Sequence, residues 1–241
     1  MSANARFAGA VVLVAGGTGA LGRAVSEAFL REGATVITTY RSKDEQRRLI
    51  EAVPDVQSRL EGEEVDVTDD ATTRALVQRI MMRHAQLDVL VNTVGGYAGG
   101  RKLWDVETAV LDRMLALNLR SFHALARAVV PILLKQGRGA IVNVAAKAAL
   151  EPPAGASAYA ASKAAALAMT DSLAAELLGS GVRANTVLPS VIDTAANRMA
   201  MPKADFAKWP KSAEIAKVIL FLSSDEARAV HGASIPVYGN R

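Results

Sequence analysis

The sequence predicts an α/β fold in which a parallel sheet of about seven strands has helices on both faces. Short, continuous apolar runs such as residues 10–15 are typical of strands that are buried on both sides. Segments with apolar residues at helical spacing alternate with these runs along the chain. The first run leads into a glycine-rich turn at residues 16–22 and then into a helical pattern. This order predicts a doubly wound sheet of the Rossmann type.

The other elements follow from periodicity and from residues that start or stop them. Asp69 or Thr68 can cap the helix after the third strand, and Pro189 breaks the sixth strand. Residues 191–210 show neither the periodicity of a helix nor that of a strand. We expect them to form a mobile lid over the substrate. The expected strands are residues 10–15, 35–39, 60–67, 87–92, 139–146, 182–188 and 233–237, and the expected helices are residues 21–32, 44–52, 71–84, 108–135, 157–178 and 212–223.

The composition narrows the class of protein. A chain of 241 residues can bury a sizeable core, and we expect residues 1–241 to form a single domain. The chain has no cysteine and only three, widely spaced histidines, so neither a disulfide framework nor a metal site is expected. The net charge of +4 is scattered, and residues 7–22, the longest uncharged run, are fewer than the ~18 that a membrane span needs. We therefore expect no nucleic-acid or membrane partner and a reducing compartment such as the cytoplasm.

The glycine spacing Gly17-x-Gly19-x-x-Gly22 fits a dinucleotide fingerprint. Glycine permits the tight turn, lets the backbone approach a pyrophosphate, and lets the helix pack closely on the strand. The helix N-terminus then offers free N–H groups and a partial positive charge to the phosphates. We expect a nucleotide at this turn, in contact with Gly16, Gly17, Thr18, Gly19, Ala20, Leu21 and Gly22.

The end of the second strand bears on the choice of cofactor. The fingerprint predicts an acid about 20 residues on, which would hold the ribose 2′-OH of NAD. The sequence instead has Tyr40, Arg41 and Ser42, followed by Lys43. A guanidinium can pair with a 2′-phosphate through two hydrogen bonds, so NADP(H) is favoured over NAD(H). The alternative is that these residues form an ordinary basic surface loop.

A tyrosine and a lysine stand four residues apart in Tyr159-Ala-Ala-Ser-Lys163. On a helix such a pair shares one face, with Cβ atoms roughly 5–6 Å apart. An ammonium at that distance lowers the tyrosine pKa, so the phenol can exchange a proton nearer neutral pH. Taken alone, the pair is equally compatible with an exposed helix face that has no catalytic role. Because ligands bind at the C-terminal ends of parallel strands, and Tyr159 opens the helix after the fifth strand, we expect the pair to be catalytic.

With these motifs, the chain resembles the short-chain dehydrogenase/reductase family along essentially its whole length. The matches are residues 16–22, 66–67, 92–95 and 185–194, with Asn118 and the Tyr159/Lys163 pair. The resemblance implies that Tyr159 is the general acid/base, that Lys163 binds the nicotinamide ribose, and that Asn118 supports a proton relay through water. It also implies a homo-oligomer, dimer or tetramer. Further cofactor contacts that it implies are Asp66, Val67, Asn92, Val94, Gly95, Pro189, Ile192 and Thr194.

One departure from the family pattern narrows the expected substrate. Ala146 stands where the family usually has a serine that polarises the substrate carbonyl, and Ser157 is the only nearby hydroxyl that could substitute for it. Loss of one donor to a developing oxyanion typically costs ~10²–10³ in rate, which favours a substrate whose charge is delocalised. Dihydropteridine reductase, one branch of the family, resembles this chain at residues 95–100, 146–150 and 193–209. The expected substrate contacts are Gly96, Ala146, Lys147, Phe206 and Trp209.

These observations predict an NAD(P)H-dependent reductase of a conjugated C=N or C=O substrate, with Tyr159 as proton donor. A general carbonyl or alcohol oxidoreductase that tolerates Ala146 is the alternative within enzymes. A cofactor-binding regulator that has lost catalysis is the alternative from another class. The presence of Tyr159, Lys163 and Asn118 argues against the regulator.

Overall fold

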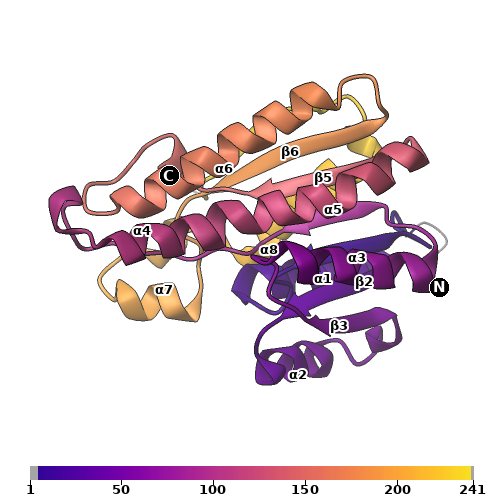
Figure 1. Ribbon diagram of the computed structural model, residues 1–241. Helices are drawn as coiled ribbons and strands as arrows, with labels where there is room; N and C mark the ends of the chain where they lie inside the picture. Colours follow the sequence, from indigo (N-terminus) through magenta and orange to yellow (C-terminus); the bar gives the residue numbers. More distant parts are fainter. Residues whose placement is uncertain (1–4, 240–241) are drawn as a thin grey trace.

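The computed structural model describes residues 5–239, and its centre is a seven-stranded sheet in the order β3-β2-β1-β4-β5-β6-β7 (Figure 1). All six neighbouring pairs of strands are parallel. The predicted fold class is confirmed. The strands are β1 (Val11–Ala15), β2 (Thr35–Tyr40), β3 (Leu60–Glu64), β4 (Val89–Asn92), β5 (Gly139–Val144), β6 (Val182–Pro189) and β7 (Ser234–Val237).

Helices cover both faces of the sheet, as the alternation of strand side chains requires. Val12 and Val14 of β1 face a core that includes α1 and α8, whereas Leu13 faces a second core that includes α3, α5 and α6. The helices are α1 (Ala20–Arg31), α2 (Lys43–Ala52), α3 (Asp70–His84), α4 (Thr108–Leu115), α5 (Ser121–Gln136), α6 (Ser157–Glu176), α7 (Ala195–Ala200) and α8 (Ser212–Ser223).

Three predicted segments differ from the observed structure by more than two residues at an end or in continuity. Strand β3 ends at Glu64 instead of residue 67, because its only partner, β2, ends at Tyr40, which pairs with Glu64. The long helix expected at 108–135 is interrupted by a π-helical turn, Ala116–Arg120, between α4 and α5. Residues 191–210, for which no regular element was predicted, contain the short helix α7 and a 3₁₀ turn, Phe206–Lys208.

The segment Thr108–Gln136, taken as one helix, has the length and composition of a membrane span, with a mean hydropathy of 1.2. Its apolar character has a role within the fold. Phe122, Leu125, Val129 and Leu133 are fully buried in the core beneath the sheet. Length and composition alone therefore do not make this helix a membrane segment.

Candidate active site

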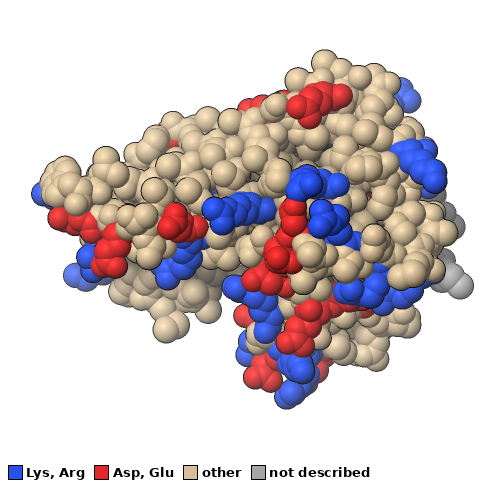
Figure 2. Space-filling view, in the orientation of Figure 1, with Lys and Arg blue, Asp and Glu red and all other residues tan. Residues whose placement is uncertain are grey.

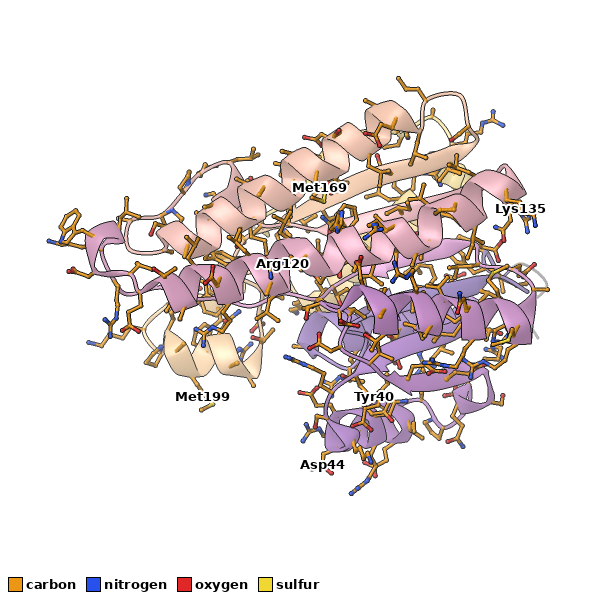
Figure 3. All side chains as sticks on the ribbon, in the orientation of Figure 1. Tyr40, Asp44, Arg120, Lys135, Met169 and Met199 are labelled. Carbon is orange, nitrogen blue, oxygen red and sulfur yellow. The ribbon has the colours of Figure 1, made fainter. Side chains whose placement is uncertain are left out.

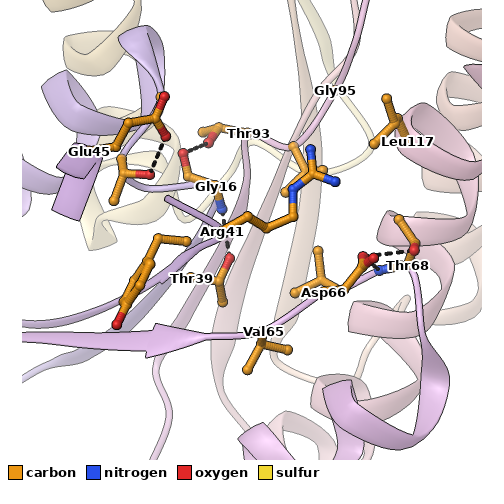
Figure 4. A pocket seen from close by; sticks show the side chains of 15 residues that line it. Gly16, Thr39, Arg41, Glu45, Val65, Asp66, Thr68, Thr93, Gly95 and Leu117 are labelled. Atoms are coloured by element: carbon orange, nitrogen blue, oxygen red, sulfur yellow. Dashed lines mark hydrogen bonds between the residues drawn. The ribbon is translucent and has the colours of Figure 1, made fainter. Parts of the chain in front are cut away.

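The predicted site residues gather at the C-terminal ends of the strands. A pocket of about 240 Å³ lies there, between the glycine turn after β1, the end of β2 and the loops after β3 and β4 (Figure 4). In the space-filling view the molecule is notched between the part that carries α7 and the part that carries α2 (Figure 2). Of the predicted residues, the pocket is lined by Gly16, Thr18, Gly19, Tyr40, Arg41, Asp66, Val67, Val94 and Gly95, and its other lining residues are Thr39, Glu45, Val65, Thr68, Thr93 and Leu117.

The glycine turn has the geometry that its spacing predicts. Gly16 has a φ of 72°, a left-handed conformation that favours glycine. A β-carbon on Gly22 would collide with the carbonyl oxygen of Gly16, so helix α1 can approach the turn only without one. Gly17 and Gly22, with Ala20 and Leu21, do not line the pocket. They position the turn, while Gly16, Thr18 and Gly19 face the ligand side.

Side chains that were not predicted hold the turn in place. The Gly16 N–H donates to Thr39 Oγ1 at 2.9 Å, at the end of β2. Thr93 Oγ1 donates to the carbonyl oxygens of Ala15 and Gly16, at 2.7 and 3.1 Å. Threonine is too common in strands to be singled out from sequence, and only the parallel register brings these hydroxyls beside the turn.

The end of β2 places a cation and an acid in the same pocket. Arg41 reaches into the pocket (Figure 4) and makes no ion pair with any described residue. Glu45, on the first turn of α2, accepts a hydrogen bond from Thr18 Oγ1 at 3.2 Å. Ser42 does not line the pocket; it caps α2 by accepting from the Glu45 N–H. Ser42 and Glu45 have the spacing of a capping box, so Glu45 could have been noticed in the sequence.

An asparagine in the π-helical turn anchors the loop after β4. Asn118 is buried, accepts from the Gly96 N–H at 2.9 Å, and donates to the Gly96 carbonyl oxygen at 3.0 Å and to Ser162 Oγ at 2.9 Å. π-Helical turns inside helices are frequent at functional sites. Asn92 is also buried, and it bonds to Asn143 and to the Val94 N–H, so it shapes the loop from within the sheet.

Lys163 lies close to the same loop. Its ammonium is buried and donates to the Val144 carbonyl oxygen, at the end of β5, at 2.9 Å. A β-carbon on Gly95 would lie 2.8 Å from Asn118 Oδ1 and 3.1 Å from Lys163 Nζ. Glycine at this position therefore allows the loop to pass close to both groups. Burial lowers the Lys163 pKa to about 8, because desolvation penalises the ammonium.

The prediction that Lys163 lowers the Tyr159 pKa was wrong. The Tyr159 pKa is raised to about 12, first because burial disfavours the phenolate and second because Tyr97 lies nearby. The two tyrosine rings meet edge-on, with centroids 5.0 Å apart. Tyr97 itself is exposed. It covers the Tyr159 phenol, and sequence analysis missed it because nothing in a glycine-rich loop indicates where its side chain will point.

Several predicted site residues do not line the pocket at the C-terminal ends of the strands. The Lys147 ammonium pairs with Glu151 at 3.0 Å and lies 5.2 Å from the centre of the Tyr238 ring. Ser157 lines a different pocket, beside α4. The remaining residues, which line neither pocket, are Asn92, Gly96, Asn118, Ala146, Tyr159, Lys163, Pro189, Ile192, Thr194, Phe206 and Trp209.

The residues of segment 191–210, the predicted lid, bond mainly to one another. Arg198 forms a two-point ion pair with Asp193, at 2.6 and 2.8 Å, and lies 4.9 Å from the centre of the Phe206 ring. Phe206 packs against Trp209, with centroids 5.0 Å apart, so the two rings cover each other instead of a pocket. Thr194 caps α7. Met199, on α7, points away from the sheet into solvent (Figure 3).

The geometry can now be compared with known proteins. The sequence profile of the family described as short chain dehydrogenase matches residues 10–205. The 3-oxoacyl-[acyl-carrier-protein] reductase FabG of Thermotoga maritima is 32% identical over 242 residues, which cover 97% of this chain and 98% of that protein. This chain belongs to the short-chain dehydrogenase family. The predicted family and the predicted enzyme class, an NAD(P)-dependent oxidoreductase, are confirmed.

Solved structures show the same fold. Carveol dehydrogenase from Mycobacterium avium, in complex with NAD, is 25% identical, with a TM-score of 0.88 and coverage of 96% of this chain and 97% of that one. ElxO with bound NADP shares the fold at 22% identity, with a TM-score of 0.89 and coverage of 95% and 96%. One of these two structures holds NAD and the other holds NADP.

The residues present fit a nicotinamide cofactor. The glycine turn leaves room for a pyrophosphate beside Thr18, and the Arg41 guanidinium is free to pair with an anion. When bound, the cofactor would supply or accept the hydride. The protein's own residues would hold the loop after β4 through Asn118 and keep a proton on Tyr159 for transfer.

Proposed function

We propose that this short-chain dehydrogenase uses NADPH to reduce a conjugated C=N or C=O group, in the manner of a dihydropteridine reductase. The observation that carries the proposal is a methyl group at position 146, where the family usually has a serine hydroxyl. Ala146 is buried and lies two residues after Val144, the last residue of β5. Tyr159 is then the donor on which the reaction depends.

A protonated Tyr159 suits the direction of reduction. Its pKa of about 12 keeps the phenol in the acid form at neutral pH, ready to give a proton to the reduced substrate. Without a second hydroxyl at position 146, stabilisation of a localised oxyanion would be weak. A substrate that spreads the developing charge over a conjugated ring depends less on that second donor.

A side-by-side substrate panel tests this function. We expect NADPH oxidation to be fastest with quinonoid dihydropterin or a quinone and at least about tenfold slower with a simple aliphatic ketone, because the second donor is missing. The measurement is kcat/KM from absorbance at the nicotinamide band. Preference for the simple ketone would contradict the proposal and support the alternative below.

The preference for NADPH depends on Arg41. Replacing Arg41 with Gln should lower the affinity for NADPH by about 10- to 100-fold and change that for NADH little, since a charge-assisted hydrogen bond contributes about 1.5–3 kcal/mol. Lys43→Gln is the matched control, because Lys43 is exposed, pairs with Glu64 at 3.6 Å and does not line the pocket. Fluorescence titration with both cofactors measures the effect. Equal losses of affinity for NADPH and NADH would contradict this role and show that Arg41 contacts a part of the adenosine moiety that both cofactors share.

A general carbonyl or alcohol oxidoreductase is the second candidate. It is favoured by the similarity to the 3-oxoacyl reductase of Thermotoga maritima, whose name describes reduction of a ketone. A non-catalytic regulator is disfavoured by the bonded arrangement of Asn118, Gly96 and Lys163 around the loop after β4.

We also propose that the enzyme is a homo-oligomer that acts in a reducing compartment such as the cytoplasm. The helices α4 and α5 expose Leu111 and Leu134 in addition to the apolar residues that they bury. Members of the family that this chain resembles usually associate through their two long helices. The absence of cysteine fits a compartment in which disulfides do not form.

A further inference from the structure

A second pocket, of about 410 Å³, lies beside the catalytic tyrosine. Its walls are the loop after β4, helix α4 and the first turn of α6, which meet at one end of the molecule (Figure 1). The pocket is open to solvent on the side of that loop, where Tyr97 and Arg101 are exposed. Its lining is Tyr97, Ala98, Gly99, Arg101, Val106, Val110, Arg113, Gly155, Ala156, Ser157 and Ala158.

The pocket is positively charged. The side chain of Arg113, on α4, makes no ion pair or hydrogen bond with any described residue. Arg101 has one loose partner, Glu107, at 3.8 Å, and both of these side chains are mostly exposed, at 64% and 72%. No carboxylate belongs to the described lining. Two guanidinium groups therefore face one cavity with little to neutralise them.

The start of helix α6 adds donors on the opposite wall. Ala156, Ser157 and Ala158 lie at the N-terminus of this 20-residue helix, where N–H groups lack partners within the helix and the dipole is positive. Ser157 Oγ is inaccessible to solvent and has no hydrogen-bond partner among the described residues.

The side chain of Tyr97 lies between this pocket and the Tyr159 phenol. The Tyr97 ring lines the pocket on one side and meets the Tyr159 ring edge-on, with centroids 5.0 Å apart. Val106 and Val110 give the pocket an apolar wall. A flat or short apolar body could thus extend from Tyr159, past Tyr97, to the two arginines.

We propose that this pocket binds an anionic end of the substrate, a carboxylate or a phosphate, while its reducible group lies at Tyr159. Arg113 is the main determinant, because Arg101 is partly neutralised by Glu107. The inference rests on the proposed reductase function and adds a substrate class to it: the preferred substrate is an anion. Guanidinium groups are well suited to planar carboxylates and to phosphates.

Matched substrates that share one conjugated ketone test the proposal. 4-Acetylbenzoate carries a carboxylate, 4-acetylphenyl phosphate a phosphate, and methyl 4-acetylbenzoate no charge. We expect the wild-type enzyme to prefer at least one anion over the ester. Arg113→Gln should lower kcat/KM for that anion by about 10- to 100-fold, mainly through KM, and leave the ester unchanged. Arg113→Lys should retain part of the preference.

Arg74→Gln is the control for net charge. Arg74 is exposed on α3 and lines neither pocket. Equal effects of Arg113→Gln on anion and ester, or none on either, would overturn the anion site. If the wild-type enzyme turns over none of the three ketones, the proposed function fails for them, and calorimetric titration with 4-acetylbenzoate then tests the site alone. Binding that Arg113→Gln abolishes and Arg74→Gln preserves would support it, and no binding would overturn it.

Discussion

Replacing Tyr159 with Phe should lower kcat by about 10²–10⁴-fold, the range that a positioned general acid contributes. The loss should be near the upper end, because Ala146 offers no second hydroxyl to share the role. The ring itself remains and can still pack against Tyr97. Stability and NADPH affinity should therefore change little. Steady-state NADPH oxidation measures kcat, and fluorescence titration measures cofactor binding.

Tyr97→Phe is the matched control for this prediction. It also removes one phenol hydroxyl from the pair of rings, but it keeps Tyr159. We expect its kcat to stay within a few-fold of wild type. If Tyr159→Phe retained full activity while Tyr97→Phe lost it, the assignment of the proton donor would be reversed.

Replacing Lys163 with Met should abolish most activity and change how stability depends on pH. The Lys163 pKa is about 8 in the folded protein and 10.5 in its unperturbed state, so the unfolded chain binds this proton more tightly. The contribution of Lys163 to stability is thus lost as the pH falls through 8 and is fully present above 10.5. Between pH 7 and 9.5, the wild-type free energy of unfolding should rise by roughly 2 kcal/mol relative to Lys163→Met.

Urea unfolding at both pH values measures this difference. The comparison across pH is more informative than either value alone, because the variant also leaves the Val144 carbonyl oxygen without its donor at every pH. Tyr159 does not interfere, since its raised pKa reduces stability only as the pH rises through about 10 to 12. A gap between the two proteins that stays constant from pH 7 to 9.5 would show that Lys163 is not perturbed by burial.

Much of the fold was predictable from local sequence. Residues 10–15 form β1 to within one residue, and the expected helix at 212–223 coincides with α8. The errors occur where a neighbour decides the structure. Asn118 lies in a π-helical turn because its side chain bonds to the Gly96 backbone, an interaction across 22 residues that no helical period encodes.

The sequence by itself determined the glycine turn, the parallel sheet and the pair Tyr159 and Lys163, because each depends on spacing along one or two elements. Only the tertiary structure decided how that pair behaves. Burial raises the Tyr159 pKa and lowers that of Lys163, since desolvation depends on everything packed around the two groups. Tertiary structure also brought Arg101 and Arg113 to one pocket with the start of α6, because the two segments 97–113 and 155–158 meet only when the sheet is assembled.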